Sequence, residues 1–113
     1  MITRYALFDG TIRDDQTEAF RAAVTAELVP LWRQFPGAVS VRVSFSVARD
    51  DGAPEFPLIL AVTYPDQDVM KAALASPVRA QSRSVTDSVV ERFFVGRIHH
   101  HVTEAVDYVP TAS

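Results

Sequence analysis

A nine-residue run of alternating apolar and polar side chains is the feature of this sequence that most restricts its fold. Its apolar members are Val39, Val41, Val43, Phe45 and Val47, and its polar members are Ser40, Arg42, Ser44 and Ser46. Successive side chains of a β-strand point to opposite faces, so this period predicts a strand over residues 39–47. We expect its apolar face to pack on a layer of helices and its polar face to point away from them.

Three further segments have the composition of strands. Residues 2–9 are rich in β-branched and aromatic side chains, and Asp9-Gly10 has the chemistry of a turn that ends a strand. Residues 57–64 are almost entirely apolar, which predicts a strand buried on both faces. Residues 97–106 are expected to form the last strand.

Helices are predicted between these strands. Apolar residues recur at helical spacing over residues 17–35. Pro30 lies inside that stretch and lacks an amide hydrogen, so we expect a kink or break near residues 26–30. A short helix is predicted over residues 67–75 and a longer one over residues 77–92. The residues expected to cap these two helices are Asp66 and Ser76.

The order of these elements, β-α-β-β-α-β with the second helical region broken in two, is that of the ferredoxin-like arrangement. It predicts an α+β fold in which a four-stranded antiparallel sheet carries its helices on one face. A chain of 113 residues has room for one domain. We expect that domain to span residues 1–108 and a loose C-terminal tail to follow over residues 109–113.

Composition argues against several classes of function. Eleven Lys and Arg against 14 Asp and Glu give a net charge of −3, which is unsuited to sequence-independent binding of nucleic acid or anionic membranes. The absence of cysteine excludes disulfides, thiolate metal sites and a cysteine nucleophile. No apolar stretch approaches the roughly 20 residues of a membrane span, and the N-terminal residues lack signal-peptide features. We therefore expect a cytoplasmic protein.

The sheet face opposite the helices is the predicted site. Arg42 and Ser44 should point to this face, as should His99 and His101 if Ile98 faces the helices. Arginine, histidine and small polar residues differ from the Lys, Glu and Thr of ordinary solvated sheet faces. A second copy of the chain could cover this face, so that two sheets enclose a cavity. A solvated face without a role is the alternative.

His99 and His101 are the first candidates for catalysis. Residues two apart in a strand lie roughly 6–7 Å from each other on one face, which suits two ligands of one metal or two cavity residues that titrate near neutral pH. Glu104 is expected on the opposite face, so no third metal ligand is evident, and we predict no metal site. A cavity-lining role and no ligand role at all both stay open.

Three more side chains join Arg42 in the predicted site. Arg42 could pair with the carboxylate or enolate of a small ligand, with Ser44 beside it, or form an ion pair at the rim. Tyr5 could act as a proton donor in the cavity or pack its ring in the core. Trp32 lies off the apolar stripe of its helix, where it could close a pocket, join an interface or simply pack.

The last helix carries three further arginines. Arg79, Arg83 and Arg92 are expected to form a solvated face of that helix. Arg83 and Asp87 stand four residues apart, a spacing at which opposite charges on a helix pair.

Two helical segments and the last strand resemble the EthD-like branch of the dimeric α+β barrel proteins. The first segment is EAFRAAVTAELVPLWRQFPGA, the second is ALASPVRAQSRSVTDSVVERFF, and the strand is VTEAV. In the first segment, the positions that match the spacing of the branch are Phe20, Pro30, Leu31, Pro36 and Gly37. The branch usually has Trp and His where this chain has Val24 and Leu28, so the chemistry of that His is not implied here.

The resemblance implies a homodimer that binds a small-molecule ligand between its sheets. Its superfamily includes monooxygenases, cyclases, isomerases, haem-degrading enzymes and members without known activity, and fold alone does not choose among them. The first hypothesis is a cofactor-free enzyme of isomerase, cyclase or monooxygenase type that acts on a small oxygenated or aromatic metabolite. The alternatives are a non-catalytic dimeric barrel and a haem or metal binder using His99 or His101.

Overall fold

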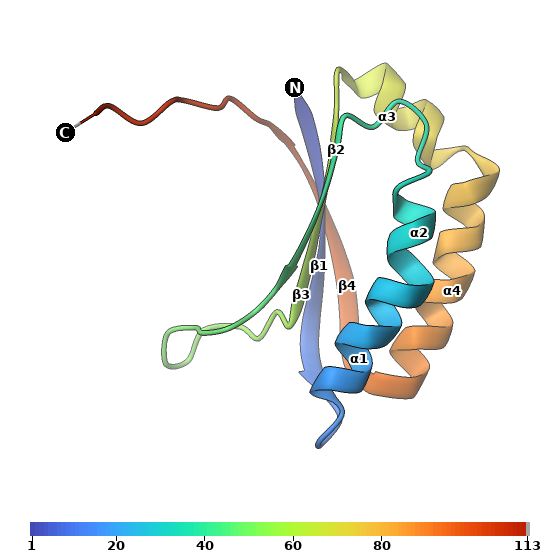
Figure 1. Ribbon diagram of the computed structural model, residues 1–113, viewed down its shortest axis with the longest axis vertical. Coiled ribbons are helices and arrows are strands. Elements are labelled where there is room, and N and C mark those ends of the chain that lie inside the picture. Colours follow the sequence, from blue (N-terminus) through green and yellow to red (C-terminus); the bar gives the residue numbers. More distant parts are fainter. Residues whose placement is uncertain (113) are drawn as a thin grey trace.

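The computed structural model describes residues 1–112, in which helices cover one face of a four-stranded sheet (Figure 1). The strands are β1 (Ile2–Ile12), β2 (Ser40–Phe45), β3 (Leu58–Tyr64) and β4 (Phe94–Glu104). The helical elements are α1 (Thr17–Ala23), the π-helical segment η1 (Val24–Leu28), α2 (Val29–Trp32), α3 (Gln67–Leu74) and α4 (Pro77–Phe93). The sheet order is β2-β3-β1-β4 with antiparallel neighbours, which confirms the predicted ferredoxin-like α+β fold.

The register of β2 confirms which of its side chains face the helices. Val41 and Val43 lie opposite Val62 and Leu60 of β3, and both β3 residues are buried in the core. Cross-strand partners share a face, so the apolar side of β2 packs under the helical layer. The other sheet face has no helix over it (Figure 1).

Proline divides the first helical region close to the predicted position. Pro30 has no amide hydrogen to donate to the carbonyl one turn earlier, and the helix widens into the π turn η1 immediately before it. The break therefore begins at Val24 rather than near residue 26. The helical region ends at Trp32 rather than at residue 35, because the amides of Gln34 and Phe35 bond three residues back in tight turns.

The prediction that Asp9-Gly10 ends the first strand is wrong. Gly10 lies opposite Gly96, and the pairing of β1 with β4 continues to Ile12 and Phe94. A Cβ on Gly10 would lie 2.2 Å from the carbonyl oxygen of Val95, and one on Gly96 would lie 2.2 Å from that of Asp9. The two glycines therefore permit a close approach of the strands instead of a turn.

Other boundaries shift at the ends of the elements. β2 covers residues 40–45 rather than 39–47, and Val39 and Val47 are 54% and 93% exposed outside it. Asp66 caps α3 as predicted, since its carboxylate accepts a bond from the amide of Val69 at 2.9 Å. Ser76 occupies the corresponding position of α4, but its hydroxyl donates to the carbonyl of Ala73 instead.

The C-terminal segment leaves β4 on the side away from the helices (Figure 1). β4 ends at Glu104 rather than at residue 106, and residues 105–112 have no regular secondary structure. Ser113, the last residue of the predicted tail, lies outside the described residues. The boundary between domain and tail at residue 108 stays a prediction. Within residues 1–112, no helix combines the length and the apolar character needed to cross a membrane.

Candidate functional site

Five of the six predicted site residues lie on the open face of the sheet, the face without helices. They belong to two rows that cross all four strands, namely Arg42, Ala61, Tyr5 and His101, and Ser44, Ile59, Leu7 and His99. The register shows that Tyr5 lies on the open face. Tyr5 is the cross-strand neighbour of His101. The catalytic roles of Tyr5, His99 and His101 stay predictions.

Arg42 and the histidines stand at opposite edges of this face. β2 and β4 are the two edge strands, so three strand spacings, roughly 14 Å, separate Arg42 from His101 across the sheet. Arg42 and Ser44 are both exposed. The structure therefore does not bring Arg42 and the histidine pair together, and a substrate-binding role for Arg42 and Ser44 stays a prediction.

A carboxylate fixes the position of His99. Its Nε2 lies 3.0 Å from Oδ2 of Asp9. Asp9 follows Leu7 by two positions in β1 and so lies on the same face of the sheet. A carboxylate at this distance orients the imidazole ring and selects which nitrogen carries the proton. Among residues 1–112, no group of three or more His, Cys, Asp or Glu is arranged to hold a metal ion.

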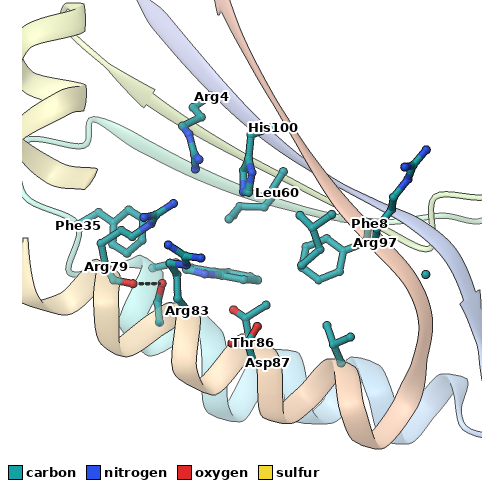
Figure 2. Close-up of a pocket in the computed structure, with 16 residues that line it drawn as sticks. Arg4, Phe8, Phe35, Leu60, Arg79, Arg83, Thr86, Asp87, Arg97 and His100 are labelled. Atoms are coloured by element: carbon teal, nitrogen blue, oxygen red, sulfur yellow. Dashed lines mark hydrogen bonds between the residues drawn. The ribbon is translucent and has the colours of Figure 1, made fainter. Parts of the chain in front are cut away.

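A pocket of about 460 Å³ lies on the other side of the sheet, between the sheet and α4 (Figure 2). Its apolar walls include Phe8, Trp32, Phe35, Leu60, Val90 and Ile98. Its polar lining includes Arg4, Arg79, Arg83, Thr86, Asp87 and His100. A concave space of this size, mostly apolar with a few convergent polar groups, has the properties of a small-molecule site.

Four basic side chains converge in this pocket from two layers. Arg4 and His100 extend from the sheet toward α4, and Arg79 and Arg83 extend from α4 toward the sheet (Figure 2). Arg97 also contributes to the lining, but its side chain points away from this cluster (Figure 2). We call Arg4, Arg79, Arg83 and His100 the basic cluster.

The prediction of a solvated face of α4 is wrong for Arg79, which is half-buried, whereas Arg83 is exposed as predicted and also borders the pocket. The predicted ion pair of Arg83 with Asp87 is also not formed, because Arg83 extends toward the sheet. Arg92 lies at the surface as predicted, where its Nη2 is 2.7 Å from Oε1 of Glu27. A signal for the missed residues exists in the sequence, since Arg79, Arg83 and Thr86 follow the helical repeat on one face of α4.

His100 differs from its two neighbours because it faces the helices. Although the residue as a whole is exposed, partial burial of its ring lowers its pKa to about 4, and the positive charges of Arg4, Arg79 and Arg83 act in the same direction. Its neighbour His99 adds a smaller contribution of the same sign. At neutral pH the imidazole is therefore uncharged, with one nitrogen free to accept a proton or hydrogen bond.

A buried phenol lies near the same arginines. Tyr64, at the end of β3, has no exposed surface, and its hydroxyl has no hydrogen-bond partner within residues 1–112. Burial raises the pKa of Tyr64, while the charges of Arg4 and Arg79 oppose that rise. Burial also lowers the pKa of Arg4, together with the charges of Arg79 and Arg83. The hydroxyl is thus a neutral donor without a partner within residues 1–112, and Tyr64 is not among the residues that line the pocket.

Trp32 is the one predicted site residue that lines this pocket. It lies at the end of α2, only 3% exposed, and contributes to the apolar wall. Trp32 therefore packs in the core and also borders the pocket. Both roles are among the alternatives that the sequence leaves open. Because it is the only tryptophan of the chain, tryptophan fluorescence reports on the surroundings of Trp32, which include this pocket.

The fold and the site define a protein of the ferredoxin-like α+β class with a basic, partly apolar pocket between its layers. The chain matches no protein-family model, and no curated protein is significantly similar to it in sequence. Solved structures share its fold. An ethyl tert-butyl ether D (EthD) family protein from Bacillus halodurans is 19% identical with a TM-score of 0.75, over 94% of this chain and 99% of that chain.

Two other solved structures extend the comparison. SnoaB, a cofactor-independent oxygenase from Streptomyces nogalater, is 15% identical with a TM-score of 0.60, over 97% of each chain. A dimeric protein of unknown function with a ferredoxin-like fold from Bacteroides fragilis is 12% identical with a TM-score of 0.62, over 92% of this chain and 95% of that chain. At these identities the likeness establishes the fold, and at that level it confirms the predicted resemblance to EthD-like dimeric α+β barrel proteins.

Proposed function

We propose that this chain binds a small molecule in the pocket between the sheet and α4. The observation that carries the proposal is the combination of apolar walls and the convergent basic cluster in a cavity of about 460 Å³. Apolar walls favour an aromatic or aliphatic body, and a few convergent polar groups orient an oxygenated substituent. SnoaB, which shares the fold, is a cofactor-independent oxygenase, and an oxygenated or aromatic metabolite as the ligand here is in keeping with that chemistry.

Cofactor-free catalysis in this pocket is a second candidate, and the uncharged His100 is the observation that favours it. A neutral imidazole can accept the proton of an acidic C–H bond or a phenol, leaving the electron pair on the substrate as an enolate or phenolate. Arg4 and Arg79 would stabilise that negative charge. Isomerisation and cyclisation both begin from such an anion, so these reaction types follow from the same step.

Filling the pocket should abolish binding. Thr86 of α4 borders the pocket and is half-buried, so Thr86→Phe places a ring in the space that the ligand needs. We expect at least a tenfold loss of affinity for any phenol, hydroxyquinone or aromatic acid that quenches the fluorescence of Trp32 in the parent protein. The matched control is Ser84→Phe, which adds the same ring to an exposed position of the same helix and should keep the parent affinity.

Two results would contradict this proposal. One is unchanged affinity in Thr86→Phe, provided that its circular dichroism spectrum matches that of the parent protein. The other is a tenfold loss in the double variant His99→Ala/His101→Ala without a loss in Thr86→Phe. The second result would place the site on the open face of the sheet, where the sequence alone predicts it.

We also propose that a second copy of the chain covers the open face. This face has apolar, half-buried side chains at its centre, including Leu7, Ile59 and Ala61. The C-terminal segment beside it carries Tyr108 with 85% of its surface exposed. The dimeric protein from Bacteroides fragilis shares the fold, which supports a homodimer here. In that dimer, the open-face residues Tyr5, His99, His101, Arg42 and Ser44 would lie between the two sheets.

Light scattering tests the assembly. We expect twice the chain mass of 12.5 kDa at micromolar concentration. Leu7→Lys should give the monomer mass, because a charge at the centre of an apolar interface loses its solvation when the interface forms. Val47→Lys, at a position 93% exposed outside the sheet, should leave the dimer unchanged. A parent protein of 12.5 kDa under these conditions would rule out the dimer.

A further inference from the structure

The basic cluster restricts the charge of the ligand. We propose that the ligand is a carboxylate on an apolar body, and that its two oxygens lie between Arg4 of β1 and Arg79 and Arg83 of α4. This inference rests on the proposed function, because it assigns a chemical class to the ligand of the same pocket. It makes the pocket specific for an anion rather than for an oxygenated molecule in general.

Within residues 1–112, none of the three guanidinium groups forms an ion pair. In the part of the chain that the structure describes, the ion pairs are Arg49–Glu55, Arg92–Glu27 and His99–Asp9, and none of them includes a member of the basic cluster. Arg4 and Arg79 are half-buried, so their charges are only partly solvated, whereas Arg83 is exposed. Asp87 is the one acid among the lining residues. The lining has four arginines, the three of the basic cluster and Arg97, so with Asp87 its net charge is 4 − 1 = +3.

The positions of these arginines suit a carboxylate. They reach the same space from two opposing layers, so one anion placed between the layers can contact both (Figure 2). Guanidinium groups bind carboxylates through two parallel hydrogen bonds, and such charge-assisted bonds are stronger than neutral ones. The apolar body would then lie along Phe8 and Trp32.

A bound carboxylate should also change the protonation of His100. The groups that act on His100 are Arg4 of β1, Arg79 and Arg83 of α4 and its neighbour His99, and all of them disfavour the imidazolium form. Asp87 lines the same pocket. A carboxylate between the arginines offsets their positive charge and can accept a bond from the protonated ring. Binding of the ligand is therefore coupled to uptake of a proton by His100, since each favours the other.

A pair of probes that differ in charge but hardly in shape tests the inference. Isothermal titration calorimetry at pH 7 compares 1-naphthylacetate with its neutral amide, 1-naphthylacetamide. We expect the parent protein to bind the acid at least tenfold more tightly than the amide. Arg79→Gln and Arg83→Gln should each weaken binding of the acid about 10- to 100-fold and of the amide less than threefold. Arg33→Gln, which removes an exposed arginine outside the pocket, is the control and should change neither affinity.

The histidine resonances supply an independent readout. In NMR titrations from pH 7 to pH 5, His100 of the free protein should remain mostly neutral, in line with a pKa of about 4. With saturating 1-naphthylacetate, we expect it to be mostly protonated at pH 5. The amide should cause no such change. Arg79→Lys, which keeps the charge but not the planar fork, should recover part of the affinity that Arg79→Gln loses.

The possible results separate the two proposals. Equal affinities for acid and amide, with binding still lost in Thr86→Phe, would overturn the anionic ligand and leave the pocket as the binding site. Loss of affinity for acid and amide alike in the arginine variants would also overturn it. Binding of the acid that persists in Thr86→Phe, or no binding of either probe at millimolar concentration, would contradict both proposals.

Discussion

Replacing Phe20 with alanine should lower the free energy of unfolding by about 3–5 kcal/mol. Phe20 lies in α1 with no exposed surface, and its ring centroid is 6.3 Å from that of Phe93 and 6.4 Å from that of Phe94. The substitution removes these aromatic contacts and leaves a cavity where α1, α4 and β4 meet. Chemical denaturation at one fixed protein concentration measures the effect, and the fixed concentration prevents any dimerisation from changing the comparison.

The control for Phe20→Ala is Val47→Ala. Val47 is 93% exposed, so its truncation should change the free energy of unfolding by less than about 0.5 kcal/mol. The cost predicted for Phe20 is a large share of the stability of an ordinary domain, which is about 5–15 kcal/mol. A loss below roughly 1 kcal/mol in Phe20→Ala would mean that the core does not depend on this aromatic contact.

Replacing Gly96 with alanine should cost roughly 3 kcal/mol or more, although it adds a single methyl group. The added Cβ would lie 2.2 Å from the carbonyl oxygen of Asp9 and 2.7 Å from the Cα of Gly10. Both are backbone atoms of β1, so the strand itself must move. Gly96 also has a φ of +156°, a conformation that side-chain-bearing residues rarely adopt. The midpoint of chemical denaturation should fall accordingly.

Gly52→Ala separates the contribution of the backbone angle from that of the clash. Gly52 has a φ of +78° and no atom within 4 Å of the position that a Cβ would take. Its replacement should cost only the left-handed conformation, about 1–2 kcal/mol. Similar losses in Gly52→Ala and Gly96→Ala would show that the close approach of β1 and β4 is not what requires glycine.

The faces of the strands could be predicted from the sequence, because the two-residue period of a strand is a local property. The alternation of Val41 and Val43 with Arg42 and Ser44 assigns each residue to a face without knowledge of its partners. The same parity places His99 and His101 on the open face. The break before Pro30 is predictable for a similar reason, since it follows from a missing amide hydrogen in one turn of helix.

The functions of the two glycines depend on neighbours distant in sequence. Asp9-Gly10 has the local chemistry of a turn, yet Gly10 lies in a continuous strand opposite Gly96. A turn glycine and a glycine required by close packing look alike in a sequence, since both are small and flexible. Only the pairing of β1 with β4 distinguishes them.

By itself, the sequence determined the fold class, the order of the elements and the face on which each strand residue lies, since these follow from local periodicity and backbone chemistry. The tertiary structure alone decided where the candidate pocket is. Arg4, Arg79 and His100 are separated by 75 and 21 positions along the chain and come together because α4 packs over the sheet beside β4. Whether arginines of a helix face water or a sheet depends on the rotation of that helix in the assembled layers, and tertiary packing sets that rotation.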